Sequence, residues 1–178
     1  MKILSILTCI IFTFIVSVLL SGVQNSIADE LNEKLNGTYA VTSVITCQAT
    51  GQGAISIFHF QGLFTFNGDG TGEAEEITVL VVSTAPSPPS PYPVSMTGQF
   101  TYTVWSNDYF TIDDLVLFNN AAPVTIEDII QDGWLGHGGQ TLIISDTYPN
   151  VENVYLDEEP FATRTCGRTG TAVKISKY

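Results

Sequence analysis

Oxygen-bearing side chains recur at every second position in the segment "FNGDGTGEAEE", which ends at Glu76. Four of them have the alternating spacing of oxygen ligands in a calcium-binding loop: Asn67, Asp69, Thr71 and Glu73. Calcium loops of the EF-hand type have more carboxylates in their first half and have helical flanks. The flanks here have the residue pattern of β-strands. Calcium binding is therefore the less favoured interpretation of this segment.

The same segment contains the strongest short signal for a β-hairpin. Asn67-Gly68 and Asp69-Gly70 are the dipeptides that favour the positive φ angles of a tight return between twisted strands. We therefore interpret Asp69, which lies between two glycines, as a residue of a β-turn and not as a ligand or catalytic acid. Glu73 and Glu75 are expected on the solvent-facing side of the following strand, with Glu76 pointing the other way.

No catalytic, metal-binding or cofactor-binding motif stands out elsewhere, and we predict none. His59 lies between two phenylalanines of a strand-like run and lacks a nucleophile with a positioned base. His137 lies in the glycine-rich "WLGHGGQ", where a ligand could approach closely. The paired carboxylates at 113–114, 127–128 and 157–159 are sequence neighbours, which point to opposite faces of a strand and so do not form a catalytic dyad.

The first 28 residues have the features of a secretory signal peptide. Lys2 precedes an apolar run that ends at Leu20, and small residues precede a cleavage point after Ala28. A retained membrane anchor is the alternative, because the run is just long enough to span a bilayer. Removal of residues 1–28 with their one lysine leaves residues 29–178, a single domain of net charge −13, compared with −12 for the full chain. Such an acidic surface disfavours nucleic acid and anionic membranes as partners.

Two cysteines lie outside the signal segment, Cys47 and Cys166. An exported protein meets an oxidising environment, so the pair predicts one disulfide between the early and late parts of the chain. A catalytic thiol is the alternative, but it would need a positioned base. A secreted or periplasmic location follows from the signal and the cysteines together.

The rest of the chain has the residue pattern of short strands separated by turn residues, and this pattern predicts an all-β fold. We expect an antiparallel meander that closes into a barrel of about eight strands, preceded by a short helical turn within 29–37; a β-sandwich is the alternative. Thr125 to Gly133 could form a short helix, and Gly167 to Gly170 are assigned to a turn. The Pro-rich stretch Ser83–Pro93 is expected to be a long loop, either a lid over a barrel mouth or a passive connector.

With these elements in place, the chain resembles the lipocalins, a calycin-type family of small exported barrels. That family begins with a helical turn that leads into Gly-x-Trp, and Gly37-Thr38-Tyr39 places Tyr39 at the Trp position. Asp108-Tyr109 resembles the family's Asp-Tyr near a strand turn. The resemblance implies an apolar cup that is closed at one end, with Arg164 or Arg168 covering Tyr39. Avidin-like and other small exported barrels share as much of this pattern.

Three functions agree with such a barrel. The first is binding of a small apolar ligand, or service as an interaction module. The second is an enzyme of the cyclase or isomerase type, and the third is a structural surface protein with a filled core. The predicted ligand contacts are aromatic residues and a residue of the glycine-rich loop: Phe60, Tyr102, Trp105, Trp134 and His137. An oligomeric state is not predicted.

The turn interpretation predicts that calcium has no effect on stability. Addition of calcium should leave the melting temperature unchanged for both the wild type and Asp69→Ala, because Asp69 would serve the turn and not an ion. A melting shift that depends on calcium and disappears in Asp69→Ala would show that the segment is a metal site.

Overall fold

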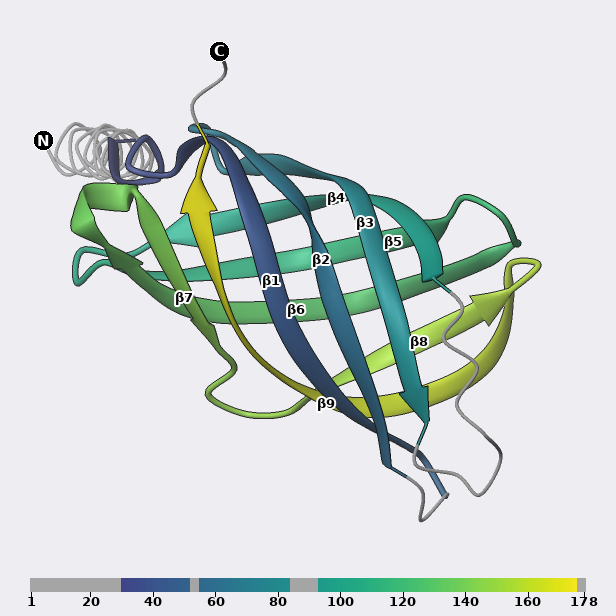
Figure 1. Ribbon diagram of the computed structural model, residues 1–178. Helices are drawn as coiled ribbons and strands as arrows, with labels where there is room; N and C mark the ends of the chain where they lie inside the picture. Colours follow the sequence, from purple (N-terminus) through teal and green to yellow (C-terminus); the bar gives the residue numbers. More distant parts are fainter. Residues whose placement is uncertain (1–29, 52–54, 84–92, 176–178) are drawn as a thin grey trace, which may run out of the picture.

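The computed structural model describes residues 30–51, 55–83 and 93–175 (Figure 1). The predicted signal peptide and residues 84–92 of the Pro-rich stretch lie outside these ranges. None of the helices within them has the length and hydrophobicity needed to cross a bilayer.

The described chain is almost entirely β-strand, with a helical turn at residues 30–35 and a 3-10 turn at His137–Gly139. The strands are β1 (Asn36–Ala49), β2 (Ile55–Asn67), β3 (Thr71–Ser83), β4 (Pro93–Val104), β5 (Tyr109–Asn119), β6 (Val124–Gly136), β7 (Thr141–Ser145), β8 (Asn150–Leu156) and β9 (Glu159–Lys174). β1 to β6 follow one another as an antiparallel meander. The predicted all-β class and the predicted helical turn are confirmed.

The sheet closes because β9 pairs with β1. β7 and β8 share one position in the wall, since each pairs with part of β6 on one side and part of β9 on the other. The nine strands therefore form a closed antiparallel barrel with eight strand positions. Figure 1 shows β9 beside β1 at the point of closure. Closure removes the unpaired edges that a sandwich would retain.

The disulfide lies across the closing seam. Cys47 of β1 and Cys166 of β9 are direct partners in the strand register, and their sulfur atoms are bonded. The bond joins residues that are 119 positions apart in the sequence. The predicted disulfide between the early and late parts of the chain is confirmed, at the place where barrel closure requires these parts to meet.

Aromatic side chains fill one half of the barrel interior. Alternation along β2 and β4 points Phe64, Phe66, Phe100 and Tyr102 inward, and all four are buried. The ring of Phe66 packs edge-on against Phe100 and Tyr102, with centroids 5.2 and 5.0 Å away. Edge-to-face contacts of this kind add to the hydrophobic gain of burying the rings. This half has a packed core.

The helical turn at residues 30–35 covers this half and makes it the closed end of the barrel. Asn32 accepts a hydrogen bond from the Val104 amide at 2.8 Å, and the Tyr102 hydroxyl donates to the Leu35 carbonyl at 2.7 Å. On the surface, Lys34 forms an ion pair with Asp108, with 2.7 Å between Nζ and Oδ1. The helical turn is thus held by buried hydrogen bonds to β4 and by an exposed ion pair to the turn that follows β4.

Tyr39 is fully buried at the closed end, next to the helical turn. Its hydroxyl donates to the Gly139 carbonyl at 2.6 Å, and burial raises its pKa to about 12, so the donor proton is retained. The cation over its ring is Lys174, with Nζ 5.9 Å from the centroid. The expectation that Arg164 or Arg168 covers Tyr39 is wrong, because both point into the other half of the barrel, where they border a cavity.

Three local expectations are corrected. Thr125 to Gly133 is part of strand β6, because strand pairing with β5 and β8 overrides the local helix signal. Gly167 to Gly170 lie inside β9 and do not form a turn. Glu76 does not point inward: a bulge in the β3–β4 pairing adds a residue there, and Glu76 is exposed like Glu75.

The hairpin interpretation of Asn67 to Thr71 holds: these residues connect β2 to β3. Gly68 and Gly70 have φ angles of +85° and +90°. Asp69 accepts hydrogen bonds from the Thr71 amide at 3.0 Å and the Thr71 hydroxyl at 2.7 Å, which lower the pKa of its carboxyl group. The acid stabilises the turn locally.

Gly70→Ala should lower the free energy of unfolding by about 1–2 kcal/mol, the cost of a left-handed backbone for a residue with a Cβ. That Cβ would also lie 3.0 Å from the Asn32 side chain. Urea denaturation measures the change. The matched control is Gly167→Ala, whose added Cβ atom would have no neighbouring atom within 4 Å. This variant should leave the free energy of unfolding unchanged or raise it slightly. Equal losses in both variants would contradict the turn geometry.

Candidate functional site

A cavity of about 180 Å³ occupies the interior of the barrel away from the closed end. We call this half the cavity end; the β5–β6 and β8–β9 turns lie there. The wall is mainly apolar and is drawn from strands around the barrel: Ile45, Phe58, Phe60, Val79, Val94, Met96, Leu117, Asn119, Val124, Ile126, Ile129, Gln131, Val154, Arg164 and Arg168.

Strand alternation places these side chains. Along β2, Phe58 and Phe60 point inward, and His59 between them is exposed. Register then aligns inward residues of neighbouring strands, as for Phe60 with Val79 and Val79 with Val94. Phe60 also packs edge-on against Phe64 of the aromatic core, with centroids 5.9 Å apart. Phe60 therefore separates the packed half of the barrel from the cavity.

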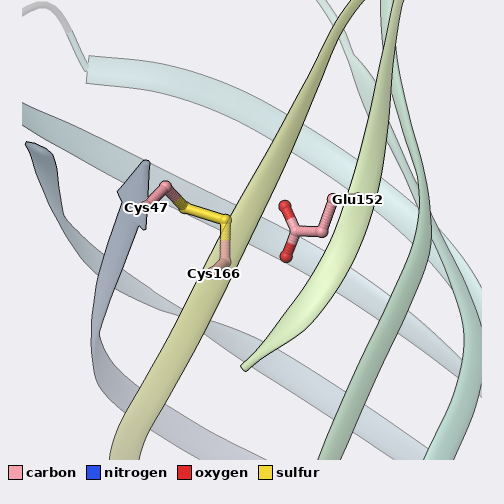
Figure 2. A group of neighbouring side chains, drawn as sticks. All are labelled: Cys47, Glu152 and Cys166. Carbon is pink, nitrogen blue, oxygen red and sulfur yellow. A yellow bond between two sulfur atoms is a disulfide. The ribbon is translucent and has the colours of Figure 1, made fainter. Parts of the chain in front are cut away.

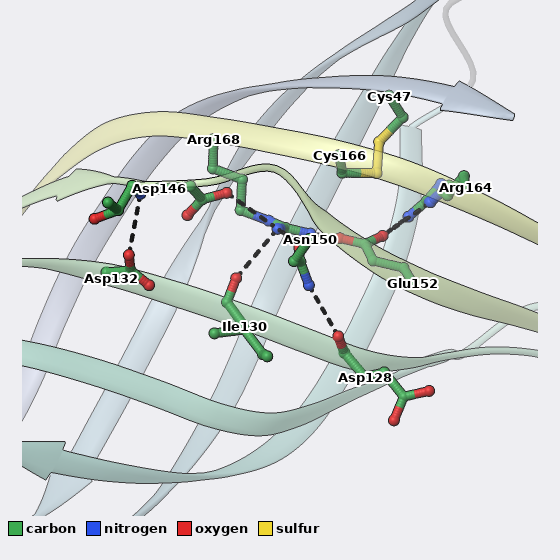
Figure 3. Close-up of polar contacts among 11 residues, drawn as sticks. Cys47, Asp128, Ile130, Asp132, Asp146, Asn150, Glu152, Arg164, Cys166 and Arg168 are labelled. Carbon is green, nitrogen blue, oxygen red and sulfur yellow. Dashed lines mark hydrogen bonds and ion pairs between the residues drawn. A yellow bond between two sulfur atoms is a disulfide. The ribbon is translucent and has the colours of Figure 1, made fainter.

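The barrel wall has a gap beside the cavity. β6 pairs with β8 through residues 124–127 and with β7 through residues 133–136, so the residues between lack a strand partner on that side. Side chains take the place of the missing strand (Figure 3). Arg168 Nη1 donates to the Ile130 carbonyl at 3.3 Å, and Asn150 Nδ2 donates to the Asp128 carbonyl at 2.9 Å. The primary role of Arg168 is therefore structural, because its guanidinium group pairs with a backbone carbonyl that would otherwise lack a partner.

A buried carboxylate lies between two arginines next to this gap. Glu152 of β8 is fully buried and contacts Arg168 Nη2 through Oε1. Its Oε2 lies 2.7 Å from Arg164 Nη2 and 2.8 Å from Arg164 Nε. The carboxylate also lies near the sulfur atoms of Cys47 and Cys166 (Figure 2). Those sulfur atoms are bonded to each other and the carboxylate is held by guanidinium groups, so this trio is a structural cluster and not a set of metal ligands.

Asp146 completes the polar cluster. Its Oδ2 lies 3.4 Å from Arg168 Nη1, and its side chain is 4% exposed. Burial raises the pKa of Asp146 to about 6, although the charge of Arg168 acts in the opposite direction. Its Oδ1 has no hydrogen-bond partner within the described ranges. Asp146 is therefore the member of the cluster whose ionisation is least well compensated.

Three polar residues besides Arg168 border the cavity. The Arg164 guanidinium stacks over Phe58, 5.3 Å from the ring centroid, and burial lowers its pKa to about 10, so it stays charged at neutral pH. Gln131 points inward from β6 and is 4% exposed. Asn119 accepts a hydrogen bond from the Ala121 amide in the β5–β6 turn. The wall can therefore offer hydrogen bonds to a ligand that is otherwise apolar.

The residues that the sequence suggested as ligand contacts do not come together. Phe60 borders the cavity. Tyr102 is buried at the closed end, where its hydroxyl accepts a hydrogen bond from the Gly68 amide at 2.8 Å. Trp105 and Trp134 are 51% and 44% exposed, and His137 is exposed in the 3-10 turn. Ligand contact by these residues remains a prediction for Phe60, and the other four lie away from the cavity.

Sequence reasoning did not single out Gln131 or Arg164 as cavity residues. Gln131 lies within Thr125 to Gly133, the segment that the sequence predicts as a short helix, so an inward position on a strand is not expected for it. Arg164 was assigned to Tyr39 through the family resemblance. The inward alternation of Ile129, Gln131 and Gly133 is the signal that would have found the first of them.

No protein-family model and no curated protein matches this chain. Among solved structures, the S-type phycobiliprotein lyase CPES from Guillardia theta is similar, with 8% sequence identity, coverage of 88% of this chain and 98% of that chain, and a TM-score of 0.32. A likeness at that score carries no argument, and the closed barrel rests on its own strand pairing.

Asp146 should make stability depend on pH. Its pKa is raised from 3.8 to about 6 on folding, so the folded state holds the proton more tightly and stability falls as pH rises from about 4 to 6. Asp146→Asn keeps the neutral form. We expect the variant to gain about 1–3 kcal/mol relative to the wild type across this range in urea denaturation. An unfolding free-energy difference that stays constant between pH 4 and 6.5 would contradict the assignment.

Proposed function

We propose that this protein is exported and binds a small apolar molecule inside its barrel. The observation that carries the proposal is the cavity at the cavity end, which has a mainly apolar wall built from inward side chains of strands around the barrel. An apolar wall binds by removing ligand surface from water, and closed walls of this kind are typical of ligand sites. The predicted signal peptide and the disulfide support export to an oxidising compartment.

The cavity size limits the ligand. An engineered cavity of about 150 Å³ binds benzene, and this cavity measures about 180 Å³. A ligand of roughly seven to ten non-hydrogen atoms is therefore the expected class. The cavity lies below the range of about 300–1,000 Å³ that is typical of sites for drug-sized ligands.

Binding is favoured over the other two functions. A structural protein with a filled core would not need the cavity, since void space costs stability. An enzyme of the cyclase or isomerase type would need a group that transfers protons. The ionisable residues on the described wall are Arg164 and Arg168, and arginine stays protonated at neutral pH. These side chains fit recognition better than proton transfer.

Toluene is a suitable first probe because it is apolar and close to the size of the cavity. We expect toluene to raise the melting temperature of the protein, because a ligand that binds only the folded state stabilises it by RT ln(1 + [L]/Kd), about 2.7 kcal/mol at a hundredfold excess over Kd. Ile126→Trp should abolish the shift, because Ile126 borders the cavity and the indole would fill it.

Ile130→Trp is the matched control. Ile130 lies on the same strand but is 42% exposed on the outer face, so this variant should keep the toluene shift. Failure of toluene and similar apolar probes to shift the wild-type melting temperature would refute cavity binding. Native mass spectrometry of protein from its own source would then show whether any small molecule is retained.

A further inference from the structure

The first observation is a polar side chain without a partner inside the barrel. Gln131 is 4% exposed and borders the cavity, yet its side-chain amide makes no hydrogen bond with the residues that the structure describes. The amide atoms of Gln131 are not among the fully buried polar atoms that lack a partner, so they face the cavity, and covering them with apolar surface would cost free energy. An apolar ligand alone would leave this amide unpaired, so the ligand is expected to carry a polar atom.

The second observation is a guanidinium group with a free donor position, that of Arg164, which borders the same cavity. Arg164 directs Nε and Nη2 to Glu152, whereas Nη1 has no hydrogen-bond partner within the described ranges. The Arg164 side chain is 19% exposed. Its stacking on Phe58, which also borders the cavity, keeps the group against the apolar wall. Arginine has donors only, so the free position calls for an acceptor.

The charges near the cavity favour an acceptor that is negatively charged. Arg164 and Arg168 both border the cavity, while the carboxylate between them, Glu152, is shared by the two. The other acid of the cluster, Asp146, contacts Arg168 and not Arg164. The described cavity wall therefore presents two guanidinium groups and no carboxylate, although the cluster as a whole holds two arginines and two acids. Charge-assisted hydrogen bonds to such a group are about twice as strong as neutral ones.

We propose that the ligand of the barrel is a small apolar monocarboxylate, whose carboxylate is held by Arg164 Nη1 and the Gln131 amide and whose hydrocarbon part fills the cavity. This inference rests on the proposed function and adds the chemical class of the ligand. Gln131 and Arg164 are then the residues that determine specificity, and the apolar wall supplies general affinity.

A pair of probes of equal shape tests the proposal on the wild-type protein. Phenylacetate and phenylacetamide have the same carbon skeleton and differ only in the charge and donors of the head group. We expect isothermal titration calorimetry at neutral pH to give phenylacetate at least tenfold tighter binding than phenylacetamide. Toluene serves as the apolar reference, because its binding tests the cavity without the polar groups.

Three variants test which residues are responsible for the preference. Gln131→Leu removes the amide and retains an apolar side chain, so phenylacetate should bind about tenfold more weakly while toluene binds equally well or better. Arg164→Met, made together with Glu152→Gln so that no carboxylate loses its partner, should remove the preference for phenylacetate over phenylacetamide. Arg164→Lys should restore part of it, because the charge remains. Thermal melts identify any variant that fails to fold.

The outcomes separate this inference from the proposed function. Binding of toluene and phenylacetamide without a preference for phenylacetate would overturn the inference and leave apolar ligand binding intact. An unchanged phenylacetate affinity in Gln131→Leu would show that a neutral group or water pairs with the amide, and would likewise overturn it. Absence of binding by all three probes would refute the proposed function itself.

Discussion

The pairing of β9 with β1 is the interaction on which the rest of the structure depends. Eleven register pairs, from Tyr39 with Lys174 to Ala49 with Arg164, join the two ends of the chain. Only in a closed sheet do the inward faces of all strands meet around one interior, and only then does that interior exclude water. The disulfide between Cys47 and Cys166 lies on the same seam, so the covalent bond reinforces the contact that creates both the core and the cavity.

The interior is packed in one half of the barrel and holds a cavity in the other half. The cavity is the basis of the proposed ligand binding. At the closed end, large rings pack against one another and the helical turn at residues 30–35 covers them. At the cavity end, the inward positions hold smaller aliphatic side chains such as Val79, Val94 and Val154. Side chains of this size leave free space between opposite walls. The same alternation rule therefore produces a rigid core in one half and a ligand-sized volume in the other.

The polar cluster shows how a structural need can also shape a binding site. β7 and β8 together replace a single long strand, which leaves the middle of β6 without a partner from the described strands on that side, while its other side pairs with β5. Arg168 and Asn150 supply those partners, and Glu152 balances the buried charge of Arg168. Buried ion pairs of this kind contribute little net stability, because desolvation opposes their attraction. They do place positive charge beside an apolar cavity, where it can recognise an anion.

The sequence alone determined the features that depend on local patterns. Alternation and turn dipeptides determined the all-β class, and Asn67-Gly68-Asp69-Gly70 determined a hairpin, because positive φ is a property of those residues themselves. The two cysteines outside the predicted signal peptide determined the disulfide pair, because an exported protein meets an oxidising environment. The helix expected at Thr125 to Gly133 shows the limit of local signals, since pairing with distant strands decided that segment.

Only the tertiary structure decided the candidate site. Phe60 could be selected from sequence as an inward aromatic residue, but Trp105 and Trp134 are equally aromatic and lie at the surface. Which side chains share a cavity depends on register, on barrel closure and on the sum of side-chain volumes across opposite walls. Gln131, Arg164 and Phe58 lie on three different strands, and no local pattern in the sequence relates them. Closing the sheet brought them around one cavity.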